Sequence, residues 1–314
     1  MTATCTPRRS YLLVGFLTSA LTVLMLLGGC DTVSTDPESE VVVEAYLIAE
    51  EPLPQVRLTQ SVPATERFTP RDAAVRGADV AIQRLNADGT VEATYPYEET
   101  TPGVYQPVDA SPSVSPRTRY RLNVQTSDGT DVRAETTVPD TITVLDVANT
   151  DVIYQGPEQP QFTIRPAQGT DRTNTYAFAV TSKLDFETLS EEELAEELTP
   201  FYADAYDPEE QQIAEFKRGA SPLINEDSFT FNDDGTITLD VPWIGFAFYG
   251  ANTVAINAPD ENYYDLIRTQ TTQQGGLAPG EIPNVIDRVE GGTGIFGSLS
   301  RTGATITIER PPGF

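Results

Sequence analysis

Cys30 is the residue whose surroundings specify a chemical reaction most fully. It follows an apolar run from Tyr11 to Leu27 and the small pair Gly28-Gly29, and two arginines precede that run. A basic segment, an apolar segment and small residues before the cut are the parts of a secretory signal. This order predicts that residues 1–29 are a lipoprotein-type signal peptide. The chain is then cut before Cys30, and the Cys30 thiol carries lipid.

The alternative is that the apolar run is a membrane-spanning anchor. Tyr11 to Leu27 is 17 residues long and is interrupted by Thr18, Ser19 and Thr22. A helix needs about 20 apolar residues to cross a bilayer, so this run is marginal, and the cysteine after Leu-Gly-Gly favours processing. The other cysteine, Cys5, lies in the signal, so we expect no disulfide in the mature chain.

A G-x-G-x-x-G pattern occurs at Gly292 to Gly297. In dinucleotide-binding proteins this pattern follows a strand and opens a helix, whose N-terminus receives the pyrophosphate. Here the residues from Ser298 to Gly303 lead into the alternating stretch Ala304 to Ile308, which predicts a strand instead. We therefore interpret the glycines as a turn that lets the backbone pack closely, and we predict no cofactor.

Three Asp-Gly pairs and many carboxylates raise the question of metal binding and acid catalysis. Asp88-Gly89, Asp128-Gly129 and Asp234-Gly235 lack the spacing of a calcium loop, and Asp-Gly favours hairpin turns, so we predict no metal site. A pair of carboxylates could serve a glycosidase. With 47 acidic residues, close pairs are expected anyway, and no spacing singles one out.

Trp243 and Tyr264 are the residues that we single out as candidate contacts for a ligand or a partner. Aromatic rings can stack on a sugar or pack against a protein. Trp243 lies in an apolar stretch with Phe246 and Phe248, where core packing is the alternative role. Tyr263 and Tyr264 are consecutive in a predicted helix, so one can face the core while the other stays available.

The composition excludes several classes of function. The chain has 47 acidic and 20 basic residues, of which only Lys183 and Lys217 are lysines, and a net charge of −27. Such a charge excludes general nucleic-acid binding and argues against a surface that lies flat on anionic lipid. Histidine is absent, which removes histidine-based triads and histidine-ligated zinc. A cation-binding surface remains an alternative to a solvated acidic shell of the halophilic type, which we favour because the acids are spread along the chain.

The elements that must position these residues are mostly strands. Residues 30–40 are polar and acidic and predict a tether. Residues 41–140 contain about seven short alternating segments with turn signals between them, for example Val41 to Ile48 and Tyr120 to Val124. This pattern predicts an immunoglobulin-like β-sandwich.

Residues 141–314 predict a second β-rich domain with short helical insertions. Ser190 to Glu193 form a capping-box sequence that opens one helix, and Asp207-Pro208 opens another that Gly219 ends. Asp260 is positioned to cap a third helix. Strands are expected at Phe246 to Phe248, among other places, and at Ala304 to Ile308. The expected fold class is therefore mainly β.

The mature chain resembles the DUF4249 lipoproteins of Bacteroidetes-type bacteria. The resemblance rests on the cysteine after Leu-Gly-Gly, the acidic tether and pieces that follow in the same order. These pieces are Val41 to Leu47, Val56 to Ser61, Gly77 to Val80, Pro102 to Tyr105, Tyr120 to Leu122, Asp260 to Tyr264, Asn284 and Gly291 to Gly297. The resemblance implies an outer-membrane lipoprotein, often encoded beside TonB-dependent transporters, with an undefined molecular role and no catalytic residues to carry over.

These observations lead to one expected function and two alternatives. We expect a non-enzymatic outer-membrane lipoprotein, attached through lipid on Cys30, that acts as an accessory or binding partner of a TonB-dependent uptake system. The first alternative is a surface carbohydrate- or peptide-binding module that uses Trp243 or Tyr264. The second is an acid-pair hydrolase, which we place behind the other two.

Overall fold

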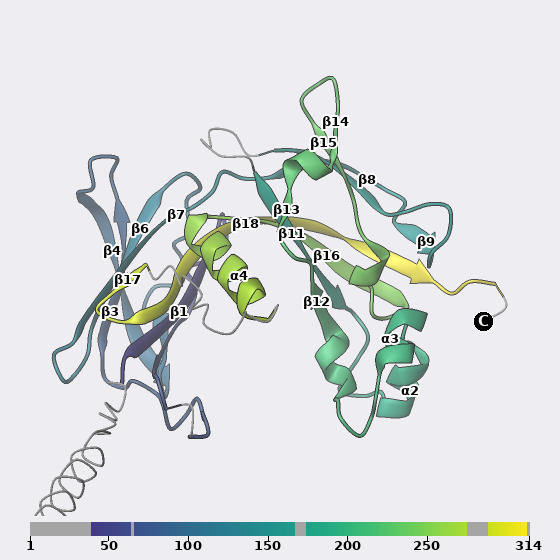
Figure 1. Cartoon of the computed structure of the whole chain (residues 1–314). Helices are drawn as coiled ribbons and strands as arrows, with labels where there is room; N and C mark the ends of the chain where they lie inside the picture. The colour runs from purple at the N-terminus through teal and green to yellow at the C-terminus, as the bar shows by residue number, and fades with distance from the viewer. Residues whose placement is uncertain (1–38, 64–65, 167–173, 275–287, 313–314) are drawn as a thin grey trace, which may run out of the picture. The chain divides into compact units, whose positions relative to one another are not determined.

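The computed structural model describes residues 39–63, 66–166, 174–274 and 288–312 (Figure 1). The predicted signal peptide at 1–29, the lipidation site Cys30 and the tether up to residue 38 lie outside these residues, so they stay predictions. In the part of the chain that the structure describes, no helix is long and apolar enough to cross a membrane.

Seven antiparallel strands form the N-terminal sandwich (residues 41–137). They are β1 (Val41–Ile48), β2 (Val56–Gln60), β3 (Asp79–Leu85), β4 (Val91–Thr101), β5 (Val104–Pro107), β6 (Arg119–Gln125) and β7 (Asp131–Thr137). Their hydrogen-bonded order is β1-β2-β5-β4-β3-β6-β7. With the strands lettered A to G, this is the A-B-E-D order and then the C-F-G order of the immunoglobulin fold. Pairing of β4 with β3 joins the two halves, so that all seven strands belong to one continuous large sheet. The predicted fold class is confirmed.

Apolar alternation and one tyrosine hold this sandwich together. Every second residue of β1 and β6 is buried, because successive side chains of a strand point to opposite faces. Tyr120 is fully buried, and its hydroxyl accepts a hydrogen bond of 2.9 Å from the backbone N–H of Ser115, five residues earlier. This is the tyrosine corner that many sandwiches have at the start of strand F.

The described residues of the second β-rich part (residues 143–309) form eleven strands. They are β8 (Thr143–Ala148), β9 (Asp151–Ile153), β10 (Gln161–Arg165), β11 (Thr175–Ser182), β12 (Arg218–Ala220), β13 (Ile224–Asn225), β14 (Thr230–Phe231), β15 (Ile237–Asp240), β16 (Gly250–Pro259), β17 (Val289–Glu290) and β18 (Thr293–Glu309). Strands β14-β15-β10-β8 form a small sheet. Strands β12-β11-β16-β18 belong to the same large sheet as the N-terminal strands, which they join where β18 pairs with β1. Side chains from both sheets share a second core that includes Phe162, Ile164, Phe178 and Ile256.

Short helices interrupt the second part, and two local predictions fail there. The capping box at Ser190 is confirmed: it opens α2 (Glu191–Glu196). The helix predicted from Asp207 is wrong: the Asp207 carboxylate accepts the Glu209 N–H as a cap would, but the chain makes a single turn there before η1 (Ile213–Lys217). The strand predicted at Phe246 to Phe248 is also wrong. Only one isolated bridge, between Leu198 and Phe248, forms there.

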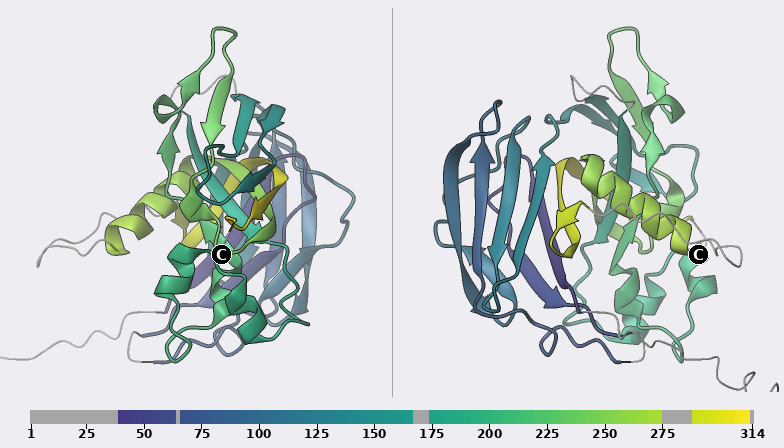
Figure 2. Two further views of the ribbon diagram at one scale, coloured as in Figure 1. Left: turned by 90° about the vertical axis from the view of Figure 1, so that its right-hand side faces the viewer. Right: turned by 60° about the vertical axis from the view of Figure 1, so that its left-hand side comes forward.

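The remaining helical segments lie on either side of that region. They are α3 (Pro200–Ala205), η2 (Glu226–Ser228), η3 (Trp243–Gly245) and α4 (Glu261–Gln274). Asp260 precedes α4 as predicted, and its carboxylate accepts the N–H of Tyr263. Helix α4 packs against β18 and β16 (Figure 1 and Figure 2).

Strand β18 belongs to both parts of the fold. Residues 293–299 pair in parallel with β1, from Val42↔Thr293 to Ile48↔Leu299. Residues 299–308 pair antiparallel with β16. Val289 and Phe296 pack in the core of the N-terminal sandwich. The predicted domain boundary between residues 140 and 141 stays a prediction, and the structure adds that a late segment completes the first core.

The glycines of the G-x-G-x-x-G pattern make this pairing possible. Gly294 has a φ of +105°, and a Cβ there would lie 2.2 Å from the Val43 carbonyl oxygen. A Cβ on Gly292 would lie 2.5 Å from the Val41 carbonyl oxygen. Close approach of two backbones therefore explains the pattern, as the sequence interpretation required.

Candidate functional site

A cavity with a largely apolar lining lies beside the edge strand β12. It encloses about 420 Å³. Its walls come from β11, α3, the segment of β12 and β13, and η3. The lining residues are Phe178, Val180, Phe201, Tyr202, Gly219, Ala220, Ser221, Pro222, Ile224, Val241, Pro242, Ile244 and Gly245. We call this feature the apolar cavity.

The side-chain hydroxyls of the lining are already hydrogen-bonded. The Tyr202 hydroxyl donates to the Ile244 carbonyl oxygen at 2.8 Å. The Ser221 hydroxyl accepts from the Phe178 N–H at 2.9 Å and donates to the Pro222 carbonyl oxygen at 2.8 Å. Burial raises the pKa of the Tyr202 phenol, so its hydroxyl stays neutral. A ligand here would meet apolar surface and few free hydrogen-bonding groups.

Two exposed apolar side chains stand at the cavity. Phe201 is 51% exposed and Ile244 is 56% exposed. Full burial of a side chain of this size is worth roughly 1.5–3 kcal/mol relative to leaving it in water. The Phe201 ring also contacts Tyr202 edge-on, with ring centroids 5.2 Å apart, which holds it in place. The cavity and these two residues form one surface that gains free energy when an apolar group covers it.

Local sequence explains how the walls form. Pro200 lies at the first position of α3, where a missing N–H costs nothing. Gly245 ends η3, and a Cβ there would lie 3.2 Å from Val180 Cγ2, so glycine lets η3 approach the sheet. Neither segment has the alternating pattern of a strand. Apolar residues between prolines and glycines were the only sequence signal for this site.

Trp243 and Tyr264 do not line the apolar cavity. Trp243 is half-buried, and its ring packs edge-on against Tyr154 at 5.7 Å and next to Phe246 at 6.4 Å, on the second core. Its neighbour Ile244 is the exposed residue of that segment. Tyr264 is half-buried on α4, while Tyr263 packs against Tyr46 with ring centroids 5.2 Å apart. The structure does not bring Trp243 and Tyr264 together, and their role as contacts stays a prediction.

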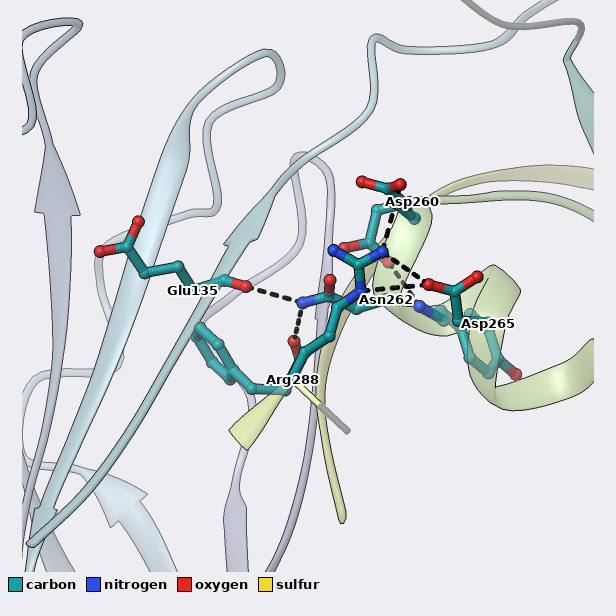
Figure 3. A network of polar contacts seen from close by, with 8 residues as sticks. Glu135, Asp260, Asn262, Asp265 and Arg288 are labelled. Carbon is teal, nitrogen blue, oxygen red and sulfur yellow. Dashed lines mark hydrogen bonds and ion pairs between the residues drawn. The ribbon is translucent and has the colours of Figure 1, made fainter. Parts of the chain in front are cut away.

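A buried polar network surrounds the start of α4 (Figure 3). The Asp260 carboxylate accepts from the Thr136 hydroxyl at 2.5 Å and from the Tyr263 N–H at 2.9 Å. The Ser298 hydroxyl lies 2.7 Å from the Thr136 hydroxyl. Because the carboxylate is buried, desolvation raises the pKa of Asp260 above its usual range.

Two further side chains extend this network. The Asn262 amide donates to the carbonyl oxygens of Glu135 at 2.7 Å and Phe296 at 2.8 Å. Arg288 forms ion pairs with Asp265 at 2.7 Å and Glu261 at 3.1 Å (Figure 3). The network ties α4 to β7 and β18, and its groups are engaged with one another. We therefore regard it as the frame that positions α4.

A second, polar cavity lies on the outer face of β3, β6 and β7, next to β17. It encloses about 480 Å³, and its polar lining includes Asp79, Asn123, Asp131, Arg133 and Glu290. The Asn123 amide nitrogen is buried and has no hydrogen-bond partner among the described residues. Within those same residues, no three acidic or sulfur side chains are placed to hold a metal ion.

Comparisons with solved structures give weak likenesses. A tetra-tandem repeat in the extending region of a large adhesion protein is 14% identical, with 86% of this chain and 49% of that chain covered and a TM-score of 0.23. Escherichia coli alpha-2-macroglobulin activated by porcine elastase is 10% identical, with 87% of this chain and 20% of that chain covered and a TM-score of 0.21. Murine CEACAM1b is 11% identical, with 87% and 100% covered and a TM-score of 0.16. The chain spans about half the length of the adhesion repeat chain, and at these TM-scores none of the likenesses informs function.

Sequence comparison is more decisive. No curated protein matches the chain. A family model described as a domain of unknown function, DUF4249, matches residues 31–304, which is most of the chain. The predicted family is confirmed: this chain belongs to the DUF4249 family.

Proposed function

We propose that the protein is a non-enzymatic, lipid-anchored binding protein of the outer membrane. It captures an apolar segment of a partner protein in the apolar cavity. A TonB-dependent uptake system is the partner that we assign. The observation that carries this proposal is the pair of exposed side chains, Phe201 and Ile244, beside a cavity whose side-chain hydroxyls are already bonded.

The chemistry of the apolar cavity favours a polypeptide over a sugar. A sugar needs several free hydrogen-bond donors and acceptors, and an exposed aromatic ring can add a stacking surface. Here the Tyr202 and Ser221 hydroxyls are engaged, and the Trp243 ring packs on the core. A space of about 420 Å³ has room for several apolar side chains of a partner segment, such as leucine and phenylalanine. Exposed Phe201 and Ile244 would then be buried around it, as in the centre of a protein interface.

Membrane attachment supports the choice of partner. The residues around Cys30 predict an anchor that confines the protein to a membrane surface. Confinement raises the effective concentration of the binding surface toward membrane-resident proteins, so a cavity of modest affinity suffices. A TonB-dependent transporter is a partner of that kind.

Affinity purification from detergent-solubilised outer membrane tests the proposal. The variants Phe201→Asp and Ile244→Asp place a charge at the cavity, and the expected loss of the co-purifying transporter is at least tenfold for each. Phe231→Asp is the matched control, because Phe231 is 53% exposed on β14 and does not line the cavity. Absence of any transporter from the wild-type sample, or equal losses for all three variants, would count against the proposal.

The polar cavity supports a carbohydrate ligand as the second candidate function. The Asn123 amide oxygen accepts from Arg133 Nε at 3.2 Å, but the amide nitrogen is a buried donor without an acceptor among the described residues, and such donors are costly to leave unpaired. A glycan array tests this directly. Binding that survives without any partner protein and is lost in Asn123→Leu would favour the carbohydrate reading over the protein partner.

A further inference from the structure

An exposed loop before β3 has a charge opposite to that of the rest of the chain. We call residues 66–76 the arginine loop. It contains Arg67, Arg71 and Arg76 against Glu66 and Asp72, within a chain whose net charge is −27. All three arginines are exposed, and none forms an ion pair with another described residue. Their charges are therefore free to meet an anion.

The loop also exposes an aromatic side chain. Phe68 is 52% exposed and lies between Arg67 and Arg71 in sequence. Aromatic rings and arginines together are typical of protein surfaces at the membrane interface, where the ring enters the headgroup layer and the guanidinium meets phosphate. An arginine guanidinium can bind phosphate through two hydrogen bonds.

Backbone hydrogen bonds hold the loop against the last residues of β2, which pair with the first residues of β1. The Gln60 N–H donates to the Ala73 carbonyl oxygen at 2.6 Å, and the Val75 N–H donates to the Leu58 carbonyl oxygen at 3.1 Å. Ser61, the residue after β2, accepts the Ser39 hydroxyl through its carbonyl at 2.7 Å. The arginine loop and the entry of the tether are therefore at the same end of β1 and β2.

The length of the tether limits how far this end can be from the lipid. Nine peptide units join Cys30 to Ser39. A fully extended chain of that length spans about 30 Å at most. Lipid on Cys30 would therefore keep Ser39, and with it the end of the sandwich that carries the arginine loop, near the bilayer.

We propose that the arginine loop binds the anionic phospholipid surface of the membrane that holds the anchor. Phe68 enters the headgroup layer, and Arg67, Arg71 and Arg76 pair with phosphates. This inference rests on the proposed lipid anchor at Cys30. The acidic remainder of the surface is repelled by the same phosphates, so attraction at one loop sets which end of the protein faces the bilayer.

Depth-dependent fluorescence quenching tests the contact. The lipidated protein is reconstituted into vesicles of phosphatidylethanolamine and phosphatidylglycerol with brominated acyl chains. Phe68→Trp reports on the loop, and Phe231→Trp, at a residue of matched exposure, is the control. The only native tryptophan, Trp243, is half-buried, and the wild type supplies its background signal.

We expect quenching of the tryptophan at position 68 to be at least twice that of the tryptophan at position 231. A basic residue at an anionic surface contributes about fivefold to local binding, so Arg67→Gln, Arg71→Gln and Arg76→Gln together should lower the quenching at position 68 to the level of the control. Equal quenching at positions 68 and 231, or no effect of the three arginine substitutions, would overturn the proposal.

Failure of the anchor is detected separately, by vesicle flotation. If the wild type does not float, Cys30 carries no lipid and its thiol is free. Coupling that thiol to a maleimide phospholipid in a Cys5→Ser chain then restores the attachment at the same residue. The quenching comparison is repeated on the coupled protein, so the arginine loop is tested whether or not the lipoprotein assignment holds.

Discussion

Gly294 lies directly against the carbonyl oxygen of Val43, where a Cβ would be only 2.2 Å away. The two residues are partners in the parallel pairing of β18 with β1. Gly294 also has a φ of +105°, which side-chain-bearing residues rarely adopt. Position 294 therefore requires glycine for two reasons: its positive φ and the lack of room for a Cβ beside Val43.

Substitution of Gly294 by alanine should therefore lower the free energy of unfolding more than backbone strain alone. We expect a loss of about 3 kcal/mol or more, since a residue strained in φ costs roughly 1–3 kcal/mol before the clash is added. Gly129→Ala is the control, because Gly129 has a φ of +93° and open space around it. Equilibrium unfolding in urea measures both. Equal losses would show that the contact with Val43 does not matter.

The buried Asp260 carboxyl should make stability depend on pH in a defined direction. Its pKa in the folded state is raised above the usual value of 3.8 by desolvation. Such a group favours the folded state most when pH is below 3.8, and this contribution is lost as pH rises through the folded-state pKa. The stability of the wild type relative to Asp260→Asn should therefore fall as pH rises from about 4.

Thermal unfolding of both proteins over that pH range checks this expectation. Using the difference between the two proteins removes the general effect of the other acidic residues, which both share, since only one of the 47 is replaced. A difference that stays constant with pH would mean that Asp260 keeps an ordinary pKa. A difference that rises with pH would mean that the hydrogen bonds from Thr136 and Tyr263 outweigh desolvation.

Arg288 should stabilise the fold through Asp265. Its guanidinium donates to one Asp265 oxygen from Nη2 at 2.7 Å and Nε at 3.1 Å, and Asp265 is mostly buried. Arg288→Met leaves that carboxylate without its cation and should cost about 2 kcal/mol. Urea unfolding measures this cost, and Asp265→Asn in the same chain should recover part of it.

A surface pair supplies the comparison for Arg288. Arg117 and Asp140 are 3.5 Å apart, and Arg117 is highly exposed. Arg117→Met should cost under about 0.5 kcal/mol, as exposed pairs generally do. If the two arginine variants lose the same stability, the burial of Asp265 has no energetic role.

Cys30→Ala should abolish membrane attachment. Without a thiol at that position, no lipid can be added, so incorporation of labelled fatty acid should disappear and the protein should leave the membrane fraction. Cys5→Ser is the control and should change neither result. A Cys30→Ala protein that remains in the membrane after washing with high salt and alkali, which removes peripherally bound protein, would show that Tyr11 to Leu27 is a spanning helix.

Local patterns were enough to predict the N-terminal sandwich. The alternation of apolar and polar residues in Val41 to Ile48 and in Tyr120 to Val124 predicts which face of each strand is buried. Asp-Gly pairs mark turns between strands. The capping box at Ser190 was also readable, because cap and partner are three residues apart. All of these signals act over a few residues.

Contacts over long separations could not be predicted in the same way. Nothing in the glycines near Gly294 identifies β1 as the partner, since Val42 and Thr293 are about 250 residues apart. The apolar cavity brings together Phe201 of α3, Ile244 of η3 and strand β12, and none of these three short elements shows a periodic pattern of apolar residues. Trp243 was predicted as a contact because of its residue type, whereas nothing in the sequence distinguished its exposed neighbour Ile244.

The position of β1 has a mechanical consequence. The strand is hydrogen-bonded along both edges, to β2 on one side and β18 on the other, and the chain before Ser39 leads directly into it. A pull on that chain along the strand axis loads both rows of hydrogen bonds in shear, so many must break together. Force applied to the tether is thus transmitted through β18 to the second core. Strand β1 should therefore resist being pulled out of the sheet.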